Sequence, residues 1–498
     1  MTATKAELAK SYSVHATTVR RDAAVTAGGW HTPQRYATIR AMPGRLDLRS
    51  LEALVRGGEI DTVLTVIPDG YGRLLGKRVV ARHFLEHVAR DGVNACIYLF
   101  TVDMEMEPLP GFKLTSWERG YGDMKLVPDL PTLRRIPWLP GTALVFCDVQ
   151  SEDGEFIEEA PRTVLKRQIA RAAQAGYTVK TAAELELYCF RESFEAARAR
   201  RYQGLTPVAG YLEDYHILQT SREEPLVRAI RNGMEAADVP VETSKGEWGK
   251  GQEEINLEYA EALEMADRTT LYKHGAKEIA HQQGCSLTFM AKYDMGAAGS
   301  SFHLHSSLWD RGGKKALFAG GDHGAPKTLP TLFGQWLAGQ LTMARELAVF
   351  YAPTVNSYKR YQAGSFAPTR IVAGWDNRTC GFRLCGEGSA FRVENRVPGA
   401  DANPYLAFAA TIAAGLHGIQ SRLKPPKLYE GNAYEDGTLP QVPKTLREAI
   451  AELERSKVAR AAFGDRVVDH YLHTARLEQQ AFDQAVTDWE LMRNFERI

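Results

Sequence analysis

Glu184-Leu185-Glu186 is the first of four short stretches that decide how this chain folds and what it can bind. The second and third are the acidic run Glu247–Glu254 and the triplet His303-Leu304-His305. The fourth, Arg392-Val393-Glu394-Asn395-Arg396, places a carboxylate between two arginines. All four are short and strand-like, and we expect them to line one pocket.

Alternation along a strand decides which of these side chains act together. Successive side chains point to opposite faces, so residues two apart share a face. Glu184 and Glu186 therefore project together, and so do His303 and His305. A face of carboxylates and arginines is costly to bury unless the charges hold something, such as divalent cations and a polyanion. The residues predicted to face the core instead are Leu185, Leu304 and Val393.

The ligand types indicate which metal would bind. Carboxylate oxygens and imidazole nitrogens from several short elements suit Mg²⁺ or Mn²⁺ better than zinc. Two such ions can clamp a transferring phosphoryl group, and nearby arginines can neutralise its oxygens. The chain has no Gly-x-x-x-x-Gly-Lys-Ser/Thr loop, which excludes a P-loop nucleotide site. A single carboxylate is more often part of a solvated face, so the prediction depends on the whole set.

Composition narrows the class of protein. The 498 residues are 44% hydrophobic and carry no formal net charge, which is typical of a globular protein and argues against nucleic-acid binding driven by bulk charge. No run of about 18 apolar residues exists, so we expect no membrane partner. The N-terminal residues also lack the apolar segment of a secretory signal, and we expect a cytoplasmic protein.

We divide the chain into a flexible N-terminal arm (1–45), a small domain (46–150) and a large domain (151–498). The boundary is placed at the acidic turn near residue 151. Within the small domain, residues 94–100 read as a strand and 104–140 as a long ordered loop rich in Gly and Pro. At the end of the chain, residues 465–493 read as one helix.

Taken together, the motifs resemble the bacterial class I glutamine synthetase family over about residues 50–498. Besides the four stretches above, further motifs carry the resemblance: Gly299-Ser300-Ser301, Asn356–Arg360, Asn377-Arg378 with Arg383, and Asn403-Pro404-Tyr405. The resemblance implies an α+β fold: a small N-terminal β-grasp domain and a larger α/β catalytic domain with a curved antiparallel sheet. It also implies a homododecamer of two hexameric rings with active sites between subunits.

The resemblance assigns roles to individual residues. ATP, L-glutamate, a nitrogen nucleophile and two or three Mg²⁺ or Mn²⁺ ions are the implied ligands. The implied ligands of the first metal are Glu186, Glu247 and Glu254, and those of the second are Glu184, His303 and Glu394. The implied glutamate-binding residues are Arg360, Arg396 and Gly299. The implied phosphate-binding arginines are Arg378 and Arg383, which with Arg360 form the catalytic set. The implied nucleotide contacts are Arg392, His305, Ser307 and Tyr259.

Two departures from the family concern the ammonium site. The family's Asp-Gly-Ser-Ser motif is absent from the corresponding residues 108–116. The Glu that ends the glutamate-covering flap is replaced by Phe366. Both changes remove negative charge from one subsite, and an apolar wall suits a substituted amine. The chain therefore resembles the γ-glutamyl-amine ligase branch, and Phe366 is predicted to contact the amine.

The identity of the amine stays open at this point. Asp103, Glu105 and Glu107 could hold the distal ammonium of a polyamine. An aromatic pocket for aniline could be lined by Phe112, Trp117, Phe366 and Trp375. We favour an alkylamine or polyamine over aniline, and ethanolamine belongs to the same range. The alternatives are a true glutamine synthetase and a catalytically silent, nitrogen-sensing homologue.

Overall fold

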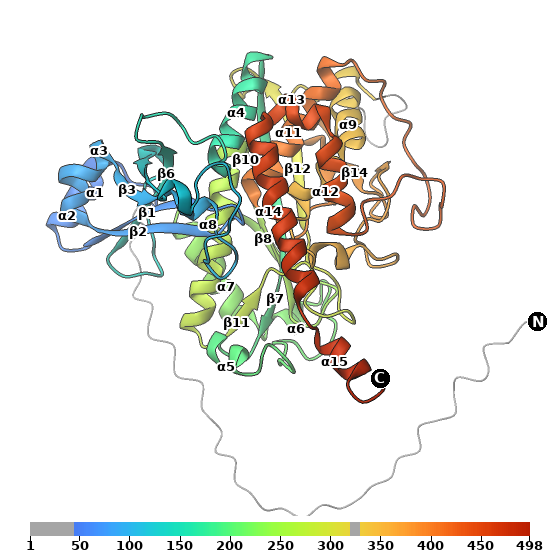
Figure 1. The fold of residues 1–498 in the computed structure, drawn as a ribbon, viewed down its shortest axis with the longest axis horizontal. Coiled ribbons are helices and arrows are strands. Elements are labelled where there is room, and N and C mark those ends of the chain that lie inside the picture. The colour runs from blue at the N-terminus through green and yellow to red at the C-terminus, as the bar shows by residue number, and fades with distance from the viewer. Residues whose placement is uncertain (1–43, 319–328) are drawn as a thin grey trace, which may run out of the picture. The chain divides into compact units, whose positions relative to one another are not determined.

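The computed structural model describes residues 44–318 and 329–498, and Figure 1 shows their course. These residues belong to one compact unit. The predicted arm, residues 1–45, lies outside the described residues except for its last two. The predicted boundary near residue 151 stays a prediction, although each side of it contributes a sheet of its own.

The N-terminal sheet is built around a parallel pair, β1 (Thr62–Pro68) and β6 (Thr142–Gln150). Its strand order is β2-β1-β6-β4-β3, and all other pairs are antiparallel. Helix α1 (Leu48–Arg56) begins at Asp47, whose side chain accepts a hydrogen bond from the Ser50 N–H. The other strands are β2 (Leu74–Val80), β3 (Val93–Cys96), β4 (Asp123–Pro128) and β5 (Arg134–Arg135).

Two predictions for this region are wrong in detail. The supposed loop 104–140 contains β4, in which Met124 and Leu126 are fully buried and Asp123 and Lys125 are exposed. Two buried positions are too short a period to stand out among the flanking Gly and Pro residues. The predicted strand 94–100 ends at Cys96 and continues as a 3₁₀ helix over Ile97–Phe100.

The second sheet carries the four stretches singled out in the sequence. Its strand order is β13-β14-β15-β12-β7-β9-β8, with β10 and β11 also paired to β7. Every pair is antiparallel except β13 with β14. The strands are β7 (Tyr177–Phe190), β8 (Val241–Gly246), β9 (Gln252–Leu257), β10 (Ala260–Glu261), β11 (Ser286–Thr288), β12 (Phe302–Asp310), β13 (Ala373–Trp375), β14 (Phe382–Cys385) and β15 (Arg392–Asn395).

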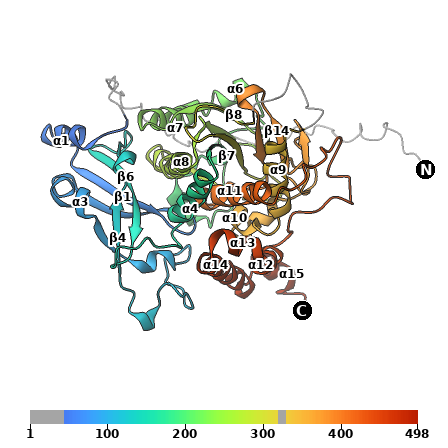
Figure 2. The same cartoon turned by 90° about the horizontal axis from the view of Figure 1, so that it is seen from above.

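Helices cover the apolar face of this sheet. Both α4 (Pro161–Gln174) and α8 (Ala262–Gln282) pack against β7, and α11 (Pro404–Gln420) packs against α4 and α9 (Thr331–Met343), as Figure 2 shows. The prediction for the core-facing residues is confirmed, because Leu185, Leu304 and Val393 are all buried in this core. The mixed α+β fold class is confirmed as well.

The C-terminal region is a helical layer that ends in a short separate helix. The predicted single helix over residues 465–493 is wrong, because α14 (Asp465–Gln484) stops at Ala485 and α15 (Asp488–Asn494) starts anew. Thr487 and Glu490 form a capping box that begins α15. The other α-helices are α2 (Ala81–His83), α3 (Ala89–Asp91), α5 (Phe194–Ala199), α6 (Ile217–Thr220), α7 (Glu224–Ala236), α10 (Ala348–Tyr351), α12 (Leu446–Arg455) and α13 (Lys457–Phe463). Within the described residues, none of the helices has the length and apolar character needed to cross a membrane.

Candidate active site

The strand register brings the predicted ligands together on one face of the large sheet. Glu184 on β7 lies opposite His303 on β12, and Glu186 lies opposite Glu254 on β9. On the other side of β12, His305 lies opposite Glu394 on β15. Paired residues of neighbouring strands point to the same face, so these carboxylates and imidazoles converge although they are far apart in sequence.

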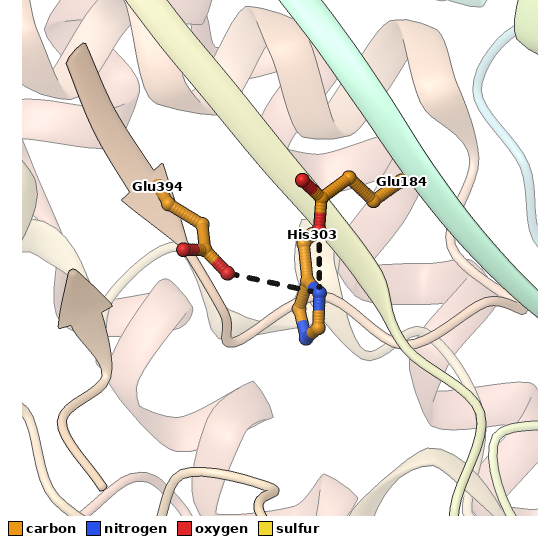
Figure 3. A group of neighbouring side chains, drawn as sticks. All are labelled: Glu184, His303 and Glu394. Atoms are coloured by element: carbon orange, nitrogen blue, oxygen red, sulfur yellow. Dashed lines mark hydrogen bonds and ion pairs between the residues drawn. The ribbon is translucent and has the colours of Figure 1, made fainter. Parts of the chain in front are cut away.

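Two groups in this face have the spacing of metal ligands. Figure 3 shows the first, in which His303 Nδ1 lies 3.3 Å from a Glu184 oxygen and 3.7 Å from a Glu394 oxygen. The second consists of Glu186, Glu254 and His303, whose ligand atoms lie within 4.8 Å of one another. His303 Nε2 is buried without a hydrogen-bond partner. An imidazole nitrogen and several carboxylates around a common point fit a divalent cation.

Electrostatics divides the set into two halves. Burial and the neighbouring Glu247 raise the pKa of Glu186 to about 7, and burial with Glu184, Glu247 and Glu186 raises that of Glu254 well above its usual range. Burial also opposes ionisation of Glu394, but Arg396, His303 and His305 together outweigh it and lower the Glu394 pKa to about 2. Arg360 and Lys245 offset only part of the negative charge around Glu186 and Glu254, and a bound cation would supply the rest.

Glu247 lies at the predicted cavity but not within either group of closely spaced ligands. It lies in the turn after β8, outside both ligand groups. One of its oxygens forms an ion pair with Lys245, and the other accepts a hydrogen bond of 3.2 Å from the Trp248 N–H. Glu247 lines the same cavity as the other predicted ligands.

The face opens into a cavity of about 900 Å³. Three predicted nucleotide contacts do not line it. His305 is buried beneath it, with Nε2 2.9 Å from a Glu184 oxygen and Nδ1 accepting from Arg392 Nε at 3.0 Å. Ser307 accepts from the Trp309 indole N–H, and Tyr259 stacks on Trp309 with ring centroids 6.3 Å apart. The predicted residues that do line the cavity are Glu184, Glu186, Glu247, Glu254, Gly299, His303, Arg360, Phe366, Arg378, Arg383, Arg392, Glu394 and Arg396.

The arginines in the cavity differ in how firmly they are held. Arg360 is buried and donates through one terminal nitrogen to the carbonyls of residues 396–398 at 2.6–3.0 Å. Arg396 pairs with Glu394, and the Nε atoms of Arg360 and Arg396 have no partner. Arg383 bridges Glu394 and Asp376, each at 2.6 Å. Arg378 is half exposed and 3.9 Å from Asp376. Buried donors without acceptors suit a carboxylate or phosphate ligand.

Gly299 allows its segment of the backbone to pass close to the Arg360 side chain. A Cβ atom on Gly299 would lie 2.4 Å from Arg360 Cγ, so only glycine lets the backbone pass this arginine. The Gly299 carbonyl accepts a hydrogen bond from Gln252 Nε2, and the same amide contacts Glu186 at 3.2 Å. Sequence reasoning assigned no role to Gln252, although it lies inside the acidic run.

Two aromatic rings stand at the cavity wall. Phe366, with a positive φ of 57°, packs edge-to-face on Trp248 at 5.8 Å between ring centroids, and both are half exposed. The sequence motifs gave Trp248 no role, although its position next to the predicted metal ligand Glu247 indicates that it lies near the site. The other aromatic candidates lie elsewhere in this chain: Phe112 packs on His470 and His473, Trp117 on Tyr121, and Trp375 on Phe391.

The predicted polyamine contacts are not at the cavity of this chain either. The Asp103 carboxylate accepts hydrogen bonds from the backbone N–H groups of Glu105 and Glu107 and so closes its own turn. None of the three lines the cavity among the described residues.

Comparison with known proteins decides the family. Residues 158–494 match the pattern described as glutamine synthetase, catalytic domain. The chain belongs to the glutamine synthetase family. The chain is 50% identical over 453 residues to the γ-glutamylethanolamide synthetase GlnA4 of Streptomyces coelicolor. The matched region covers 91% of this chain and 96% of the relative. The chain is also 38% identical over 444 residues to a glutamate–isopropylamine ligase of a Pseudomonas species, covering 88% of this chain and 96% of the relative.

Solved structures agree with this placement. The glutamine synthetase family member superposes on GmaS in complex with ADP with a TM-score of 0.78 and 28% identity, covering 90% of this chain and 99% of GmaS. Ligand-free GmaS gives a TM-score of 0.77. The expected γ-glutamyl-amine ligase branch is confirmed. Family membership makes the chain an ATP-dependent carbon–nitrogen ligase that uses a divalent metal ion.

Proposed function

We propose that this enzyme joins the γ-carboxylate of L-glutamate to a small substituted amine, and that an amino alcohol of the ethanolamine type is its preferred nucleophile. The ethanolamide product of the Streptomyces relative supports this choice, because that protein is 50% identical over nearly the whole chain. The isopropylamine ligase widens the candidate range to small alkylamines. Amine catabolism or detoxification in the cytoplasm is the role that fits such a reaction.

The observation that carries the proposal is the aromatic pair at the cavity wall. The family resemblance puts an acidic residue at the position of Phe366, and here the ring packs on Trp248 instead. An ammonium ion has no carbon skeleton and gains little from two rings. A short alkyl chain gains apolar contact, at roughly 25 cal/mol for each Å² that it buries. The loss of charge and the gain of apolar surface both favour a substituted amine.

The metal and phosphate contacts also fit the proposal. Glu186 and Glu254, with Glu247, would hold one ion, and Glu184, His303 and Glu394 another. We propose Mg²⁺ or Mn²⁺, two or three per site, because every ligand is a carboxylate or imidazole. Bound ions would neutralise phosphate oxygens during transfer. The ADP complex of GmaS supports a nucleotide substrate, for which Arg392, His305, Ser307 and Tyr259 are the proposed contacts.

The reaction follows in two balanced steps. A γ-carboxylate oxygen of glutamate attacks the terminal phosphorus of ATP, and ADP leaves. The amine nitrogen then attacks the acyl carbon, phosphate leaves, and the nitrogen loses a proton to give the amide. Arg360, Arg396 and the Gly299 backbone would orient glutamate. Arg378 and Arg383 would stabilise the charge that accumulates on the phosphoryl oxygens.

We further propose that the protein assembles into a homo-oligomer, as a dodecamer of two hexameric rings. The C-terminal helix α15 and the residue after it support assembly, because they leave apolar side chains in solvent. Trp489 is 67% exposed, and Met492 and Phe495 are each 82% exposed. A cluster of large apolar side chains of this kind is typical of a protein–protein interface.

The test is phosphate release from ATP in the presence of glutamate and Mg²⁺, with product masses measured. The amines are ammonium, methylamine, isopropylamine, ethanolamine, putrescine, spermidine and aniline. We expect the highest kcat/KM with ethanolamine and a much lower value with ammonium. Ammonium as the preferred substrate would instead identify a true glutamine synthetase. No turnover with any amine would favour a catalytically silent homologue.

A pair of variants ties the activity to the proposed site. Glu254→Gln removes a proposed metal ligand while keeping its volume, and we expect activity to fall at least a hundredfold. Glu258→Gln changes an exposed carboxylate just beyond the same strand and serves as the matched control. Equal activity in the two variants would contradict the assigned metal site.

A further inference from the structure

A second acidic cluster lies outside both catalytic ligand groups. Glu213, Glu223 and Glu253 present carboxylate oxygens within 4.8 Å of one another, and all three residues are buried. Glu253 precedes Glu254 on β9, so the two side chains leave opposite faces of the strand. The cluster therefore shares no residue with the catalytic groups.

The oxygens of this cluster lack partners. Both oxygens of Glu213, both of Glu223 and one of Glu253 are buried without a hydrogen bond of normal geometry, and Glu213 is fully inaccessible. Their closest interactions are with one another and with the Gly251 and Gln252 N–H groups beside Glu213. Among the described residues, no lysine, arginine or histidine forms an ion pair with any of the three. The nearby Arg231 is paired with Glu224, and Arg191 donates to the Val208 carbonyl. Arg191 and Arg231 act on the cluster only at longer range, and three buried carboxylates without a direct ion pair are unfavourable unless protons or a cation neutralise them.

The backbone makes room for this arrangement. Gly246 on β8 lies opposite Glu253 on β9, so a side chain at 246 would point toward the same face. A Cβ atom there would lie 2.7 Å from Glu213 Cγ and 2.8 Å from Thr220 Cγ2. The absence of a side chain at residue 246 lets Glu213 reach the strand. The packing around Gly246 therefore brings the three carboxylates together.

We propose that Glu213, Glu223 and Glu253 bind a hard divalent cation at a site separate from the catalytic metals. Oxygen ligands alone favour Mg²⁺, Mn²⁺ or Ca²⁺ over zinc. Burial and the neighbouring Glu223 raise the pKa of Glu213 to about 9, so an ion that binds at neutral pH displaces protons. Glu253 and the adjacent Thr220 and Glu224 line the large cavity, which gives the ion a path from solvent.

The site gives the ion a structural purpose. Glu213 and Glu223 are the two ends of one segment, which includes α6, while Glu253 belongs to the sheet. A shared ion would fasten this segment to β9. Five residues of the segment line the large cavity: Asp214, Tyr215, Ile217, Thr220 and Ser221. The ion would therefore hold one wall of the substrate cavity in place.

Crystals of the full-length enzyme soaked in Mn²⁺ test the proposal by anomalous scattering. We expect a peak between the three carboxylates in addition to peaks at the catalytic ligands. Glu213→Gln should lose the first peak and keep the others. Peaks at the catalytic ligands with none at this cluster, under saturating Mn²⁺, would overturn the proposal and assign the charge to shared protons. A lack of catalytic peaks would count against the proposed catalytic site alone.

Thermal unfolding supplies a second readout in solution. Mn²⁺ should raise the Tm of the wild-type enzyme more than that of Glu213→Gln, because the variant keeps only the catalytic ions. Without metal the variant should be at least as stable as wild type, since it removes a buried acid. The matched control is Glu242→Gln, an exposed carboxylate on β8. Equal Mn²⁺-induced shifts in wild type and Glu213→Gln would contradict the proposal.

Discussion

Phe366 is the residue at which the choice of nucleophile can be tested most directly. Glu at this position would return a negative charge to the cavity wall and remove the ring that packs on Trp248. We expect Phe366→Glu to raise the ratio of kcat/KM for ammonium to that for ethanolamine by at least tenfold. Steady-state kinetics with both nucleophiles measures the ratio.

The control for this variant is Phe366→Leu, which keeps an apolar side chain and adds no charge. It should weaken amine binding without improving the use of ammonium. If Phe366→Leu and Phe366→Glu gave the same ratio, the charge at this position would not determine the nucleophile.

His470 is a second single residue with a measurable effect, in this case on stability. Burial lowers the pKa of its imidazole from 6.5 to about 3. Between these values the unfolded chain binds a proton that the folded protein excludes, so stability falls as pH falls from 6.5 toward 3. His470→Gln should flatten this dependence in thermal unfolding between pH 7 and 5. His87→Gln, at an exposed histidine, should leave it unchanged.

At the scale of elements, the turn between β8 and β9 positions Glu247 and Trp248 in the cavity. Gly249 follows them, and a Cβ atom there would lie 1.9 Å from the Tyr188 hydroxyl. That hydroxyl is itself held by a hydrogen bond of 2.9 Å to the Ala298 carbonyl, next to Gly299. Gly249→Ala must therefore displace the turn, and we expect kcat/KM to fall at least tenfold while the protein remains folded.

Circular dichroism and steady-state kinetics separate these two effects. The matched control is Gly437→Ala, because a Cβ atom at that position meets no neighbour and its backbone needs no positive φ. It should leave activity within twofold of wild type. Full activity of Gly249→Ala would show that the turn is not fixed by Tyr188.

At the scale of the whole molecule, the exposed apolar side chains at the C-terminal end allow the proposed oligomer to be tested. Removal of residues 485–498 should reduce the particle mass measured by light scattering, because Trp489, Met492 and Phe495 are lost from the proposed interface. The substitution Glu496→Ala, at an exposed polar position of the same tail, is the control and should not change the mass. An active monomeric wild-type enzyme would contradict the proposed assembly.

Much of the site could be predicted from the sequence because alternation along a strand is a local property. Placing Leu185 in the core determines where Glu184 and Glu186 point, and the same argument holds for the neighbours of Leu304 and Val393. The family resemblance added which of these residues would share each metal ion. Shorter elements such as β4 were missed, since two buried positions give too weak a period.

The sequence by itself determined the family, the α+β class, the core-facing positions and the set of acidic, histidine and arginine residues at one face. Only the tertiary structure decided the partners of these groups. Glu247 is paired with Lys245, Trp248 meets Phe366, and Glu213 converges with Glu223 and Glu253. The physical reason is that the direction of a side chain follows from local backbone geometry. Its burial and charge environment depend instead on segments that folding brings from elsewhere in the chain.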